Sequence, residues 1–179
     1  MNRRDMLKVA GTAIAGATLL GNEVFATETA NTPQKTKKKA LIIGAHPDDP
    51  EGNAGGIMIL LRKAGWDVVS VYMTKGQAGI EGKSHEEASK IREAEGRNAC
   101  NILGSKPIFM TQIDGNAEIN KERYVEMREL IKQENPDIVF THWPIDSHPD
   151  HRVCSLLVYD AWRRLGYSFE LYYYEVMSG

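Results

Sequence analysis

The sequence predicts an α/β fold in three layers, with a mostly parallel sheet covered by helices on both faces. Short apolar runs alternate along the chain with longer segments whose apolar residues recur at helical spacing. The runs are almost continuously apolar, which is typical of parallel strands buried on both faces. Because strands separated by helices are joined by right-handed crossovers, we expect neighbouring strands to run parallel.

The first half of the chain contains two such strand and helix pairs. Residues 40–44, Ala-Leu-Ile-Ile-Gly, are too few for a helix and predict a strand. Apolar residues at helical spacing follow and stop at Gly65. Residues 68–73 predict a second strand, and residues 86–103 predict a second helix that is closed by Gly104.

The second half repeats the alternation and ends on a strand. The expected elements are a weaker strand at 107–111, a helix at 121–133, a strand at 137–141, a helix at 151–165 and a last strand at 169–175. This pattern is typical of a Rossmann-like sandwich with strand order 3-2-1-4-5. In that order the loops after the first and fourth strands meet at the crevice where the strand order reverses.

The N-terminal segment reads as an export signal and not as part of the fold. Arg3 and Arg4 precede an uncharged stretch rich in Ala and Gly, which is too short and too weakly apolar for a stable membrane span. We expect residues 1–26 to be a twin-arginine-type signal for export to the periplasm or beyond, residues 27–38 a polar linker and residues 39–179 the folded domain. A basic N-terminal helix in a cytoplasmic protein is the alternative.

Composition narrows the possible partners. The 179 residues hold 22 Lys and Arg against 24 Asp and Glu, a net charge of −2, so a nucleic-acid partner is not expected. The two cysteines, Cys100 and Cys154, cannot form a disulfide framework and are expected to be small buried side chains.

Histidine, proline and aspartate gather in the two loops that the topology brings together. Residues 45–52 read Ala-His-Pro-Asp-Asp-Pro-Glu-Gly, and residues 142–151 read His-Trp-Pro-Ile-Asp-Ser-His-Pro-Asp-His. These loops contain four of the five histidines, and the triplet His-Pro-Asp occurs twice. Shuffling the same composition would produce that triplet roughly 0.01 times, so chance is a poor explanation.

Helix capping explains part of this pattern, and metal binding explains more of it. Asp49-Pro50-Glu51 is a good helix start, and so is Ser147 or His148 before Pro149. Capping does not account for the histidines, because clustering imidazoles with carboxylates costs desolvation unless they bind something. The loops therefore favour a metal site.

Two imidazoles and one carboxylate would leave one position of a zinc ion open, which is typical of catalytic sites and suits hydrolysis. Asp48 and Asp49 are adjacent in an irregular loop, so one can bind the metal while the other faces the attacking water. His148 is the candidate acid, with Asp150 as the carboxylate that orients it.

These motifs resemble those of the LmbE-like (PIG-L) family of zinc-dependent N-acetylglucosaminyl deacetylases. The resemblance is carried by Ala-His-Pro-Asp-Asp at 45–49 and His-Pro-Asp-His at 148–151. It is extended by Thr-Lys-Gly-Gln-Ala-Gly at 74–79, by Arg92-Glu93 within a helix that ends in Leu-Gly, and by the tyrosines at 172–174.

The resemblance implies a role for each candidate residue. It implies zinc bound by His46, Asp49 and His151. It further implies Asp48 as general base and His148, supported by Asp150, as the residue that faces the oxyanion and the leaving group. Arg92 is a candidate for contacting the substrate, or alternatively a surface partner of Glu95. Residues 74–79 form either an anion cradle or, as we expect, a plain turn.

The implied activity is removal of the N-acetyl group from an amino sugar or glycoconjugate. Pro50 stands where many family members have an acid, which we expect to matter little. Members usually continue well past the tyrosine-rich strand, so the domain is expected to be C-terminally incomplete. The alternatives are hydrolysis of another amide or an ester, and an inactive truncated module that binds sugar or metal. A nucleotide-binding domain is disfavoured because His46-Pro47 stands where a glycine-rich turn would follow the first strand.

Overall fold

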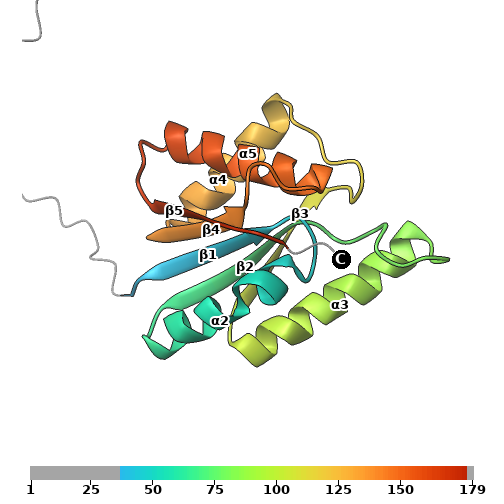
Figure 1. Ribbon diagram of the computed structural model, residues 1–179, viewed down its shortest axis with the longest axis horizontal. Helices are drawn as coiled ribbons and strands as arrows, with labels where there is room; N and C mark the ends of the chain where they lie inside the picture. The colour runs from blue at the N-terminus through green and yellow to red at the C-terminus, as the bar shows by residue number, and fades with distance from the viewer. Residues whose placement is uncertain (1–36, 177–179) are drawn as a thin grey trace, which may run out of the picture. The chain divides into compact units, whose positions relative to one another are not determined.

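A parallel five-stranded sheet forms the centre of the fold in the computed structural model, which describes residues 37–176. The strand order is β3-β2-β1-β4-β5 and all four neighbouring pairs are parallel, so the predicted 3-2-1-4-5 order is confirmed. Helices α2 and α3 cover one face of the sheet, and α4 and α5 cover the other (Figure 1). The expected signal at 1–26 and nearly all of the expected linker at 27–38 lie outside the described residues.

The observed elements follow the predicted alternation closely. The strands are β1 (Lys39–Gly44), β2 (Asp67–Thr74), β3 (Lys106–Gln112), β4 (Ile138–His142) and β5 (Glu170–Tyr174). The helices are α2 (Asp49–Lys63), α3 (His85–Leu103), α4 (Lys121–Glu134) and α5 (Pro149–Arg164). Helix α5 begins two residues earlier than expected, because Pro149 occupies its first turn, where a missing N–H costs nothing. Both His-Pro-Asp motifs therefore run from a loop directly into a helix.

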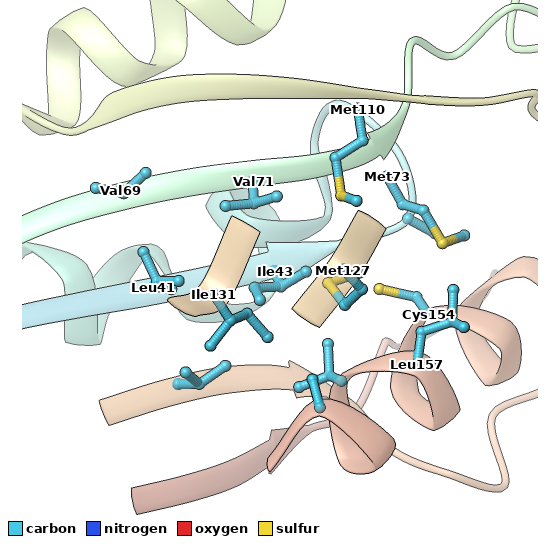
Figure 2. Close-up of a cluster of buried hydrophobic side chains, with 14 of the residues drawn as sticks. Leu41, Ile43, Val69, Val71, Met73, Met110, Met127, Ile131, Cys154 and Leu157 are labelled. Atoms are coloured by element: carbon cyan, nitrogen blue, oxygen red, sulfur yellow. The ribbon is translucent and has the colours of Figure 1, made fainter. Parts of the chain in front are cut away.

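The core has two parts, one on each face of the sheet. In β1, Leu41 and Ile43 face α4 and α5, whereas Ala40 and Ile42 face α2. Figure 2 shows the larger part, in which Met127 and Ile131 of α4 lie against the strands. The expectation of burial on both faces is confirmed for β1 and β2, whereas the edge strands β3 and β5 are partly exposed. Cys154 belongs to the larger part, Cys100 is also fully buried, and both are free thiols as expected.

Local signals explain where helix α3 begins and ends. The Ser84 hydroxyl accepts a hydrogen bond from the Glu87 N–H, and the Glu87 carboxylate accepts one from the Ser84 N–H. Gly104 ends the helix at φ 69°, in the left-handed region where glycine is favoured. Within residues 37–176, no helix is both long enough and apolar enough to cross a lipid bilayer.

Gly44, at the carboxyl end of β1, allows α2 to approach the sheet closely. A Cβ atom at this position would lie 2.6 Å from the Asp49 Cβ and 2.8 Å from the Pro50 Cδ. We expect Gly44→Ala to lower the free energy of unfolding by about 1–3 kcal/mol, because the start of α2 must shift. Gly56→Ala is the matched control: its Cβ meets nothing within 4 Å, and alanine within a helix should stabilise by about 0.5–1 kcal/mol. Urea unfolding measures both, and an unchanged Gly44→Ala midpoint would contradict the close approach.

Candidate metal centre

Three side chains that can bind a metal lie close together where the loops after β1 and β4 lead into α2 and α5. The His151 Nε2 lies 3.2 Å from the His46 Nδ1, and the two oxygens of Asp49 lie 3.4 Å from these two nitrogens, one oxygen from each. Donor atoms around a tetrahedral zinc ion with bonds of about 2.0–2.1 Å are about 3.3–3.4 Å apart. The predicted set of His46, Asp49 and His151 is thus close enough together to hold a divalent metal ion. His148 with His46 and His151, and His142 with Asp49 and His151, are further sets whose donor atoms lie within 4.8 Å of one another.

The fold brings these residues together through the pairing of β1 with β4. Because these strands are parallel neighbours, their carboxyl ends lie at the same edge of the sheet, as predicted. His46 follows β1, and His151 lies in the first turn of α5. Between His46 and Asp49 the chain turns sharply at Asp48, whose φ of 117° is rare for a residue other than glycine. The His46 N–H closes the turn by donating to the Asp49 carboxylate at 2.8 Å.

Both imidazoles bond to a carboxylate through their second nitrogen. The His46 Nε2 lies 3.1 Å from the Asp150 carboxylate and 3.0 Å from that of Asp114. The His151 Nδ1 lies 3.0 Å from the Asp146 carboxylate. Histidines that bind metals in proteins generally have this arrangement, in which the outer carboxylate fixes the orientation and the tautomer of the ring.

The three converging residues and the carboxylates that bond to their imidazoles form one largely buried cluster: His46, Asp49, His151, Asp114, Asp146 and Asp150. The electrostatics of this cluster favour a bound cation. Burial would lower the pKa of His46, but hydrogen bonds to Asp114, Asp150 and Asp49 outweigh it and raise this pKa to about 11. Burial would raise the pKa of Asp49, but hydrogen bonds from His142 and His46 hold it well below its usual range. The cluster therefore holds a positive charge on His46. A metal ion would replace that proton, since imidazole ligands bind in the neutral form.

Asp48 points away from Asp49, as predicted for adjacent carboxylates in an irregular loop. Its carboxylate is paired with the Arg92 guanidinium, which also donates to the Pro47 carbonyl. Arg92 bonds to Glu95 as well, at 2.7 Å. The pairing of Arg92 with Glu95 on its own helix is therefore confirmed. Arg92 also lines the cleft beside the cluster, and its contact with a substrate stays a prediction.

A polar cleft of about 390 Å³ opens beside the cluster. Its lining residues come from the loops after β1, β2, β3 and β4 and from α3: His46, Asp48, Gly76, Ala78, Gly79, Arg92, Asp114, Gly115 and His148. The segment 74–79 forms a plain turn in its wall, as expected. Its N–H groups donate within the protein, Gly79 to the Gly76 carbonyl and Ala78 to the Asp114 carboxylate, which argues against the anion cradle.

The predicted contact between the Asp150 carboxylate and His148 is wrong. The His148 Nδ1 accepts the backbone N–H of Asp150 at 3.2 Å, so His148 is the N-cap of α5. The Asp150 carboxylate turns to the other side, towards the end of β3, where it accepts from the His46 Nε2 and from the Gly115 N–H at 2.7 Å. The His148 ring lies edge-on to His46, with 4.8 Å between ring centroids.

Three residues of the centre carry no role in the sequence prediction: Asp114, His142 and Asp146. His142 is fully buried and stacks on His151 with 3.9 Å between ring centroids, and its Nε2 lies 2.9 Å from the Ala45 backbone nitrogen and 3.2 Å from the Asp49 carboxylate. His142 also forms a possible ligand set with Asp49 and His151. The signal that points to all three residues is position, since each lies at or just beyond the carboxyl end of a strand.

Comparisons with known proteins lead to one family. The chain is 34% identical over 134 residues to the uncharacterized deacetylase YaiS of Escherichia coli, with 70% of this chain and 66% of that protein covered. It is 30% identical over 138 residues to a probable N-acetyl-alpha-D-glucosaminyl L-malate deacetylase 2 of Bacillus cereus, covering 72% and 63%. The N,N'-diacetylchitobiose deacetylase of Pyrococcus horikoshii, solved with its inhibitor MPG, superposes with a TM-score of 0.67 at 32% identity, covering 74% and 52%. The chain thus spans about half to two thirds of the length of these relatives.

The match to a protein family covers the structural elements that build the centre. Residues 41–162 match the PIG-L family, described as GlcNAc-PI de-N-acetylase. This range runs from β1 to α5 and contains all the residues of the cluster. A match of this length, together with a relative at 34% identity, makes the chain a member of the PIG-L family.

Proposed function

We propose that this protein is a metal-dependent hydrolase that removes the N-acetyl group from an N-acetylglucosamine-type sugar or glycoconjugate. The observation that carries the proposal is the convergence of His46, Asp49 and His151 beside a polar cleft. The relatives named as deacetylases of N-acetylated sugars support the proposed substrate class. Zinc is the proposed metal because two imidazoles and one carboxylate are a typical catalytic zinc set.

Asp48 is the proposed general base. When bound, a divalent ion would polarise the amide carbonyl and lower the pKa of water. Asp48 would accept a proton from the attacking water, since its carboxylate lines the cleft and is 65% exposed. Arg92 would hold this carboxylate in place through the ion pair described above.

His148 is the proposed acid. Its ring lines the same cleft, edge-on to His46, and its position is fixed at the start of α5. We propose that His148 faces the oxyanion and donates a proton to the leaving nitrogen as the bond between carbon and nitrogen breaks. The products are then acetate and the free amine of the sugar.

The cleft suits a polar substrate of modest size. Arg92 supplies N–H donors and Asp114 supplies carboxylate acceptors at its wall, and sugar hydroxyls can bond to both kinds of group. If residues 1–26 act as the twin-arginine-type signal that we propose, the substrate lies outside the cytoplasm.

Removal of the metal provides the direct test. We expect the purified protein to release acetate and free amine in equal amounts from N-acetylglucosamine conjugates. EDTA should abolish the release and stoichiometric zinc should restore it. A substrate panel that includes an aryl acetate and an N-acetylated amino acid shows which class of acyl bond the protein hydrolyses. Activity confined to those two compounds would indicate hydrolysis of another ester or amide, and full activity without metal would contradict the proposal.

A further inference from the structure

Asp146 has a position that links two residues of the centre. Its side chain is 4% exposed and lies in the loop between β4 and α5. One carboxylate oxygen, Oδ1, accepts the His148 N–H at 2.9 Å and lies 3.0 Å from the His151 Nδ1. The same buried oxygen of Asp146 therefore contacts the backbone of His148, the proposed acid, and the imidazole of His151, a proposed metal ligand.

The loop around Asp146 is anchored by backbone contacts. The Asp146 N–H donates to the Trp143 carbonyl at 3.2 Å. The Arg152 guanidinium donates to the carbonyls of Asp146 and Ser147, at 2.6 and 2.8 Å. Because Arg152 directly follows His151 in α5, the helix that carries the ligand also holds the loop that carries the carboxylate.

We infer that Asp146 is a positioning residue that orients His151 towards the metal, as Asp150 does for His46. A hydrogen bond from the His151 Nδ1 to Asp146 would fix the tautomer whose Nε2 has its lone pair free for the ion. The negative charge of the Asp146 carboxylate would also make the imidazole a stronger electron-pair donor to the metal. This inference rests on the metal centre of the proposed function. It goes beyond the motif residues, since Asp146 lies outside the His-Pro-Asp-His sequence.

Two variants separate the charge of Asp146 from its role as an acceptor. Asp146→Asn keeps an oxygen for the His148 N–H but removes the charge, whereas Asp146→Leu removes both. We expect zinc affinity, measured by competition with a chelator, to fall by about 10–100-fold, with asparagine near the lower end of that range. The visible spectrum of the Co²⁺-substituted protein should change in both variants, because the orientation of one ligand changes. Asp160→Asn is the control, since Asp160 pairs with Arg164 on the same helix and lies outside the cluster.

A purely structural role predicts a different result. It would lower the melting temperature of the metal-free protein but leave the Co²⁺ spectrum and the zinc affinity of the folded variant unchanged, and that result would overturn the inference. If Asp146→Leu does not fold, Asp146→Asn decides by the same criteria. A parent protein that binds no zinc would overturn the metal centre itself together with this inference. A parent that binds zinc no more tightly than the Asp146 variants would overturn only the inference.

Discussion

Replacing Asp48 with asparagine is expected to lower kcat for deacetylation by about 100- to 10,000-fold, the usual contribution of a general base. Bound zinc should remain near one ion per chain, because the Asp48 carboxylate points to Arg92 and not to the three converging donors. The fold should also persist. Asparagine tolerates the positive φ of 117° at this position and has nearly the same size as aspartate.

Acetate release at saturating substrate and zinc, together with metal analysis of the same samples, measures this effect. Asp67→Asn is a suitable control, because Asp67 begins β2 at the opposite edge of the sheet and should change neither kcat nor zinc content. If Asp48→Asn turned over at the parent rate, Asp48 would not be the base. If it lost zinc as well as activity, Asp48 would belong among the ligands.

Replacing His151 with alanine is expected to remove the metal and with it the activity. His151 supplies one of three converging donors, so the loss in zinc affinity should exceed the roughly 100-fold cost of losing an outer partner of a ligand. Zinc per chain should fall close to zero after dialysis, and acetate release should fall with it. Added zinc should restore little.

The control for this variant is His85→Ala, which removes the exposed histidine at the start of α3. It should retain zinc and full activity. His151 is 5% exposed and stacks on His142, so circular dichroism must show that the alanine variant is folded. A folded His151→Ala protein with the zinc affinity of the parent would contradict the proposed ligand set.

The architecture was predictable because it depends on patterns that are local in the sequence. Each apolar run is short and each helix has its own periodic stripe. The type of each element and its place along the chain therefore follow without knowledge of distant contacts. The rule that parallel strands present their carboxyl ends at one edge then brings His46 and His151 together. The structure confirms this meeting, with 3.2 Å between the two nitrogens.

The partners of the carboxylates were not predictable in this way. Asp150 follows His148 and Pro149 in the chain, which suggested a contact with His148, yet its carboxylate bonds to His46, 104 residues away. Asp114 reaches the same ring from the end of β3, a strand that is two positions away from β1 in the sheet. Both contacts depend on how three loops pack over the edge of the sheet.

The sequence by itself determined the alternation of strands and helices and the two loops that supply histidine and aspartate. The strand order typical of a Rossmann-like sandwich then indicated which edge of the sheet carries the chemistry. The resemblance assigned Asp49 to the metal and Asp48 to the attacking water, but only the tertiary structure decided that Asp48 pairs with Arg92 and which carboxylates hold the two imidazoles. Periodicity reports which face of a regular element is buried, because the backbone of a strand or a helix repeats. In an irregular loop no such repeat exists. The turn at Asp48 and the neighbouring loops set the direction of each side chain there.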